Sequence, residues 1–355
     1  MVKRSAGATM RDRPAPAHGA ARGAGAAVSL WLVPAMVVMW TGLFGLSYLA
    51  ALARPVPHRI PLAVVASAPA AARIVGALRL GAPVAIDPRG YRGLGQARSA
   101  LLARRVDGVL AVGPAVETLY VAQAAGPPIA TVLGDVAGKL AAQQHVPLEV
   151  RDLVPLPGGD SSGLGLFYLV LACVLGGYVG TIMIMAHTSP MPAGQRIMQL
   201  AGTAALCGAS LVALARLVLD SDPLPASAVA VAALTVFAVA VCTWALLAAL
   251  GRLAVPIAIS LFVIVGSPSS GGAIPRPLLP GFYSTIGRWL PNGAAVSALR
   301  DMTYFRAASP ARPLLVLTGW AVIGLISALV VSRPSKVPLC RAGLEVEPGH
   351  LEVLP

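Results

Sequence analysis

The side chains that could bind a metal or act as nucleophiles are few and widely spaced in this sequence. There are four cysteines and five histidines among 355 residues. They are Cys173, Cys207, Cys242, Cys340, His18, His58, His145, His187 and His350. None of them stands at the short spacing of a zinc site, and the cysteines lie in apolar runs or near the C-terminus. The sequence therefore predicts no metal site and no disulfide framework.

Nucleotide-binding and catalytic motifs are also missing. The P-loop pattern G-x-x-x-x-G-K-[ST], whose backbone amides hold phosphates, does not occur. The glycine-rich residues 266–272 lack its lysine and follow an apolar run instead of a strand. There is no G-x-S-x-G nucleophile turn and no H-E-x-x-H helix. We therefore expect this chain to be no enzyme and to hold no cofactor of its own.

The composition is that of an integral membrane protein. Hydrophobic residues make up 57% and charged residues 12%, and the mean hydropathy is +0.77. Soluble domains carry roughly 25% charged residues. The net charge of +13 does not indicate nucleic acid, because the basic residues are scattered and aromatic residues are only 5%. The lipid bilayer is therefore the partner that composition predicts.

Six apolar runs predict six transmembrane helices. They cover residues 26–53, 164–186, 197–219, 228–250, 254–265 and 314–331. A span takes about 20 helical residues. The first run starts after a basic arm and is longer than the 7–15 apolar residues of a signal peptide, so we expect a retained anchor.

Basic flanks predict the orientation, because short loops rich in Lys and Arg stay in the cytoplasm. The N-terminal arm, Arg196, Arg252, Arg333 and Lys336 fall on one side if the chain crosses six times, and the acidic turn 220–222 falls on the other. We therefore expect a multi-pass protein of the plasma membrane with both termini in the cytoplasm.

The predicted organisation has five parts. They are a cytoplasmic basic arm (1–25), a first transmembrane helix (26–53), an external α/β domain (54–162), a five-helix transmembrane block (163–332) and a cytoplasmic tail (333–355). In the external domain, strands are expected at 60–66, 82–87, 106–112 and 128–135, and helices at 67–80 and 91–105. Strands that alternate with helices are typical of a small α/β domain.

The stretch between the last two runs, residues 275–305, is too rich in Gly and Pro for an ordinary span and too apolar for a free loop. Irregular backbone at membrane depth requires a protein or water-filled surrounding. We expect a re-entrant or interfacial segment with helices at 282–289 and 294–304. The break between them would comprise Leu290, Pro291, Asn292, Gly293 and Ala294. The alternative is an external loop that lies on the bundle.

The order of these elements resembles the membrane subunit of ABC-2 type transporters, and most closely the phage-infection-protein-like branch. Residues 286–305 are similar to that branch's "LP.GA...A.R" stretch before the final helix. The external domain here lacks the extended coiled coil of long members. The resemblance implies a permease subunit for export of a hydrophobic or amphipathic substrate. It also implies a second permease copy or paralogue, in a homo- or heterodimer, and a cytoplasmic ABC ATPase that supplies ATP hydrolysis.

A permease of this kind needs a cytoplasmic surface that couples it to the ATPase. The candidate is the loop between the second and third runs, which comprises His187, Thr188, Ser189, Pro190, Met191, Pro192, Ala193, Gly194, Gln195 and Arg196. Its prolines would give it a defined shape, and Arg196 could pair with an acidic groove. The alternative is an ordinary tight connection. Small residues at 200–215 could form a dimer seam or simply pack inside the bundle.

One further function stays open. The chain could be a membrane scaffold without transport activity, whose external domain binds an envelope component or a partner protein. A membrane-bound enzyme is disfavoured because catalytic residues are missing.

Overall fold

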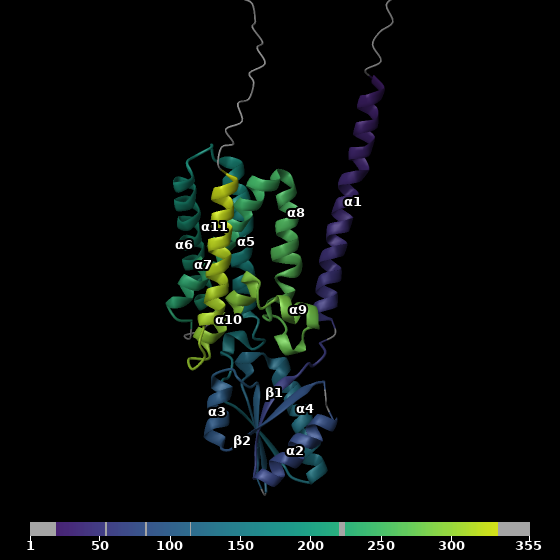
Figure 1. Cartoon of the computed structure of the whole chain (residues 1–355), viewed down its shortest axis with the longest axis vertical. Coiled ribbons are helices and arrows are strands. Elements are labelled where there is room, and N and C mark those ends of the chain that lie inside the picture. Colours follow the sequence, from purple (N-terminus) through teal and green to yellow (C-terminus); the bar gives the residue numbers. More distant parts are fainter. Residues whose placement is uncertain (1–18, 54, 82–83, 114, 220–223, 333–355) are drawn as a thin grey trace, which may run out of the picture.

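In the computed structural model, a bundle of long helices stands on a domain built around a five-stranded sheet (Figure 1). The structure describes residues 19–332 except 54, 82–83, 114 and 220–223, and the side chains from residue 34 onward. The greater part of the basic arm, the acidic turn 220–222, and the tail with Arg333 and Lys336 therefore lie outside the described residues.

Among the described residues, five helices are long and apolar enough to cross a membrane. They are Pro34–Leu52, Gly165–His187, Ala193–Val218, Ser227–Val265 and Ala311–Val331. The membrane class predicted from composition is thereby supported. The first of the five belongs to α1 (Gly19–Leu52), and the others include α5 (Gly165–His187), α6 (Ala193–Val218) and α11 (Ala311–Val331).

The fourth candidate span accounts for the difference from the six expected helices. It is 39 residues long and contains α7 (Ser227–Leu250), η3 (Gly251–Leu253), α8 (Ala254–Ala258) and the π-helical η4 (Ile259–Val265). Gly251 has a φ of +54°, a conformation that favours glycine, and it ends α7. Figure 1 shows α8 as a column separate from α7 that runs back toward the sheet domain.

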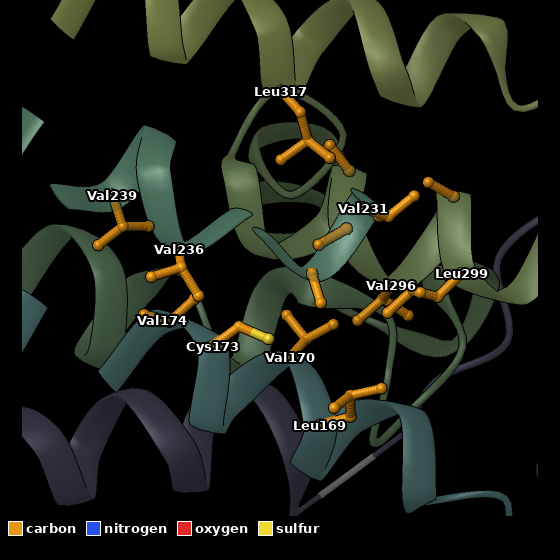
Figure 2. Close-up of a cluster of buried hydrophobic side chains, with 14 of the residues drawn as sticks. Leu169, Val170, Cys173, Val174, Val231, Val236, Val239, Val296, Leu299 and Leu317 are labelled. Atoms are coloured by element: carbon orange, nitrogen blue, oxygen red, sulfur yellow. The ribbon is translucent and has the colours of Figure 1, made fainter. Parts of the chain in front are cut away.

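The bundle is packed around α7. Its buried core combines side chains of α5, α7, α11 and α10 (Pro291–Thr303), and Figure 2 shows Cys173, Val236, Val296 and Leu317 among them. Small residues let the helices approach closely. A Cβ on Gly208 of α6 would lie 2.6 Å from the backbone nitrogen of Ala233 in α7. The face of α6 that carries Leu200, Ala204 and Gly208 therefore packs inside the bundle. Leu206 and Leu217 on another face are exposed.

The second domain contains a mixed sheet with strand order β2-β1-β3-β4-β5. Its strands are β1 (Ile60–Val65), β2 (Ile86–Tyr91), β3 (Gly108–Val112), β4 (Glu117–Val121) and β5 (Leu148–Asp152), and only β3 and β4 pair antiparallel. The helices α2 (Ala68–Gly81), α3 (Leu94–Leu102) and α4 (Pro127–Gln144) and the short turns η1 (Gln123–Ala125) and η2 (Gly158–Asp160) complete it.

One predicted strand is wrong, and two strands were missed. Residues 128–135 belong to α4, because Pro127 and Pro128 occupy its first turn and Ile129, Leu133 and Ala137 recur every four residues on its buried face. The sequence did not predict the strands β4 and β5. The strand β2 begins four residues later than the sequence predicted.

The sheet domain and the bundle share backbone contacts and core. The amide of His58, ahead of β1, donates to the carbonyl of Pro277 (2.7 Å). Pro277 lies in η6 (Arg276–Leu278), after η5 (Pro268–Ser270). Leu278 is buried in the core of the sheet domain, and Phe305 is buried in a second cluster beside the same sheet. The sheet domain therefore packs directly on the segment between the last two spans.

That segment contains two short helices, α9 (Gly281–Ile286) and α10 (Pro291–Thr303). Their connection differs from the predicted one. The break falls at residues 287–290, and α10 already begins at Pro291, where sequence predicted a start at Ala294. Proline suits the first turn of a helix because its missing amide needs no partner there. Pro291, Asn292, Gly293 and Ala294 are therefore the buried first turn of α10.

Candidate functional site: an arginine-lined cavity

A cavity of about 320 Å³ lies where the sheet domain, α10 and the start of α11 meet. Four arginines and two aspartates contribute to its wall. They are Arg104, Arg276, Arg288, Arg312, Asp107 and Asp301. This accumulation of ionisable side chains stands out in a chain with only 12% charged residues.

Arg104 connects the two domains. It follows α3 with a φ of +53°, so its side chain turns away from the helix toward the bundle. Its Nη1 forms an ion pair with Oδ1 of Asp301 in α10. Its guanidinium group also lies 5.4 Å from the centre of the Phe305 ring. One arginine of the sheet domain thus contacts both a carboxylate and an aromatic ring of the segment between the last two spans.

Arg276 joins η6 to the first turns of α10. Its Nη2 donates to the carbonyl of Gly293 (3.0 Å) and to Oγ of Ser297 (3.1 Å). Burial, together with the positive charges of Arg104, Arg288 and Arg312, lowers the pKa of Arg276 to about 10, and the charge of Asp301 opposes that fall. The group remains protonated at neutral pH, and no carboxylate of the described residues forms an ion pair with it.

Arg288 and Arg312 form the open side of the cavity, and both are exposed. The guanidinium group of Arg312 lies 5.6 Å from the centre of the Trp289 ring. Within the described part of the chain, neither arginine forms an ion pair. Both charges are therefore free to bind an anion.

Asp107 is the second carboxylate of the wall, and its environment weakens its acidity. Burial raises the pKa of the Asp107 carboxyl from 3.8 to about 6, and Arg104 and Arg89 oppose that rise. Asp301 is already paired with Arg104. The positive charges of the cavity thus exceed the negative ones, and the excess grows as pH falls toward 6. A phosphate or carboxylate group is the ligand that this arrangement fits.

The predicted break lies directly behind this wall. Gly293 supplies a carbonyl to Arg276, and Ala294 lines the cavity. Asn292 points the other way and anchors α10 to η4. In a regular α-helix the amide of Gly266 would donate to the carbonyl of Phe262, but here it donates to the carbonyl of Leu261 (3.0 Å), five residues back. The Phe262 carbonyl accepts a hydrogen bond from Nδ2 of Asn292 instead (3.0 Å).

A second buried contact continues this anchoring. Nη1 of Arg300, which is 5% exposed, donates to the carbonyl of Gly271 (3.1 Å). Gly271 has a φ of +75° and lies in the glycine-rich residues 266–272, which turn the chain after η4. Side chains of α10 thus donate hydrogen bonds to backbone carbonyls that the irregular segment leaves without a backbone partner.

The predicted coupling loop lies at the other end of the bundle (Figure 1) and takes no part in the cavity. Its irregular part is short, because α5 ends at His187 and α6 begins at Ala193. Arg196 is buried, and its Nη1 donates to Oγ1 of Thr188 (2.7 Å). Ser189, Pro190, Pro192, Gly194 and Gln195 are exposed. Arg196 therefore fixes the shape of the loop, and the exposed residues form its outer surface.

Sequence reasoning missed the arginines of the cavity. They come from three separate places in the chain, and none belongs to a motif. The sequence did contain one signal, because charged residues are rare in this chain. Arg276, Arg288 and Arg312 are ionisable residues in or beside an apolar stretch, and such residues often mark a functional site. The contribution of Arg104 depends on how the sheet domain sits on the bundle.

No family model, curated protein or solved structure matches the chain. Within the described ranges, no group of three His, Cys, Asp or Glu side chains could hold a metal ion.

Proposed function

We propose that this chain is the permease subunit of an ABC-2 type exporter in the plasma membrane. It would provide the path for a hydrophobic or amphipathic substrate, act as a homo- or heterodimer, and be driven by a separate cytoplasmic ATPase. The observation that carries the proposal is the pair of short helices α9 and α10. Both helices follow η4, the break at residues 287–290 separates them, and α10 packs into the core of the bundle before α11 begins.

The proposal includes six crossings. Gly251 ends α7, and α8 with η4 then runs back along the bundle, as Figure 1 shows. Counted as two spans, residues 227–265 bring both termini to one side and the sheet domain to the other. The basic flanks favour the cytoplasm for the side of the termini.

The exposed surface of the loop after α5 supports a coupling role. Two prolines and the bond between Arg196 and Thr188 give the loop a defined shape, which a rigid contact with an ATPase requires. Leu206, Leu217 and Met198 on α6 are exposed by 74%, 81% and 76%, and this apolar face suits lipid or a second permease copy.

The scaffold function remains the second candidate, and one observation favours it. The sheet domain is joined to the re-entrant segment by a shared core and by the Arg104–Asp301 ion pair, so ligand binding to the domain would act directly on the bundle.

Purification of the tagged chain from its native host in mild detergent tests the proposal. We expect an ABC ATPase to copurify and ATP hydrolysis to rise when both are placed in vesicles. Gln195→Glu in the loop should reduce that rise. The same exchange at exposed Gln144, at the end of α4, is the control and should leave it unchanged. If no ATPase copurifies and vesicles show no ATP-dependent movement of a fluorescent phosphatidylglycerol, the exporter proposal is wrong.

A further inference from the structure

The arginine-lined cavity continues into an apolar groove on the surface of α11. The groove has a volume of about 550 Å³ and shares Arg312 and Val316 with the cavity. Its other lining residues are Trp289, Leu315, Gly319, Trp320 and Ile323. One continuous depression therefore begins among cationic side chains and ends among hydrocarbon ones.

The groove follows one face of a candidate span. Residues 312, 315, 316, 319, 320 and 323 recur every three or four positions, so they share one side of α11. At 1.5 Å per residue this face is about 16 Å long. Leu315 is 72% exposed and Ile323 is 65% exposed. In a membrane these side chains face lipid, so the groove is open to acyl chains.

The junction between cavity and groove is held in shape. Nε1 of the Trp320 indole donates to the carbonyl of Trp289 (2.6 Å), which ties α11 to the break before α10. The Trp289 ring in turn lies against the guanidinium group of Arg312. Arg312 is thus placed at the border where a polar headgroup would meet its hydrocarbon chain.

We propose that this depression binds an anionic lipid in the leaflet next to the sheet domain. The phosphate lies among Arg276, Arg288 and Arg312, and one acyl chain lies along α11. Charge complementarity selects an anionic headgroup, because four arginines outnumber the two aspartates of the wall. The apolar groove selects a lipid over a free anion, since a soluble phosphate would leave the groove unused. This site does not depend on transport activity.

The bound lipid would join the two domains. Its phosphate contacts Arg276, which holds the first turns of α10, and lies beside Arg104, which carries the sheet domain. The lipid therefore strengthens the contact between the sheet domain and the re-entrant helices, where like charges otherwise repel.

Native mass spectrometry and thermal unfolding of the detergent-purified full chain test the proposal. Dioleoyl phosphatidylglycerol should bind and stabilise the protein, whereas dioleoyl phosphatidylcholine and inorganic phosphate should do so at least about tenfold more weakly. Arg288→Gln combined with Arg312→Gln should weaken phosphatidylglycerol binding on the order of tenfold. Arg306→Gln is the control, because Arg306 is an exposed arginine that follows α10 in the chain and does not line the cavity.

A second variant tests the groove without touching the charges. Gly319→Leu places a side chain where the acyl chain would lie, and a Cβ there meets no atom within 4 Å. It should weaken phosphatidylglycerol binding, whereas Gly202→Leu on α6, also without a neighbour within 4 Å, should not. Equal binding of phosphatidylcholine, displacement of the lipid by inorganic phosphate, or unchanged binding in both site variants would overturn the proposal.

Discussion

Gly293→Ala is the substitution that most directly tests how the two short helices α9 and α10 are packed. A Cβ at position 293 would lie 1.9 Å from the carbonyl oxygen of Gly287, whereas ordinary contact begins at 3.4 Å. The two backbones must therefore separate by about 1.5 Å. Flexible side chains cannot absorb this movement, because the clashing oxygen belongs to the backbone of the break.

The cost follows from what holds the two segments in place. The Gly287 amide donates to the carbonyl of Tyr283 (3.0 Å), and the Ala294 amide donates to the carbonyl of Leu290 (3.1 Å). Overpacking of a close-packed interior costs about 1–3 kcal/mol, and more when the backbone must shift. We take about 3 kcal/mol, which lowers Tm by roughly 6–12 °C in a domain of this size.

The assay is intrinsic tryptophan fluorescence of the detergent-purified full chain during heating. Trp289 and Trp320 lie beside the break and report on it. Gly281→Ala is the control, because position 281 starts α9 and a Cβ there meets no atom within 4 Å. Since alanine also lowers the entropy of the unfolded chain, the control should be neutral or slightly more stable. Equal melting temperatures for the two variants would refute the close approach of Gly287 and position 293.

Three further substitutions probe other contacts. Asn292→Ala leaves the Phe262 carbonyl without its side-chain donor and should lower the free energy of unfolding by about 1–3 kcal/mol, measured by thermal unfolding. Asp107→Asn should stabilise β3 at pH 7.5 by on the order of 1–3 kcal/mol but little at pH 4. Because the pKa of Asp107 is higher in the folded state, the folded state binds more protons than the unfolded state. The stability of the wild-type protein therefore falls as pH rises from about 4 to 6. Hydrogen exchange of the β3 amides measures this change in stability. Arg196→Ala frees Thr188 and should speed proteolysis of the loop after α5, and an unchanged cleavage rate would contradict the role given to Arg196.

The sequence determined the membrane class and the long helices because these depend on local properties. An apolar run of about 20 residues predicts a membrane span independently of its tertiary contacts. The predicted runs at 164–186 and 228–250 therefore agree with α5 and α7 within one residue at each end. Glycine and proline likewise marked the break before the last helix. Only the structure showed that α10 begins at Pro291.

Short elements were harder to predict from the sequence. Residues 128–135 have apolar content that suits a strand or a buried helix, and only their packing in α4 decides between them. The strands β4 and β5 pair in parallel although α4 lies between them in the chain, so this pairing becomes visible only in the sheet.

Tertiary structure alone decided where the charges meet. Arg104 lies more than 170 residues before Arg276 in the chain, and they reach one cavity because the sheet domain packs on the segment that precedes α10. Long-range contacts of this kind leave no periodicity in the sequence, since each arginine is locally an isolated charge. The sequence therefore predicts a membrane protein with a broken helical segment, and the tertiary structure places an arginine-lined cavity beside that break.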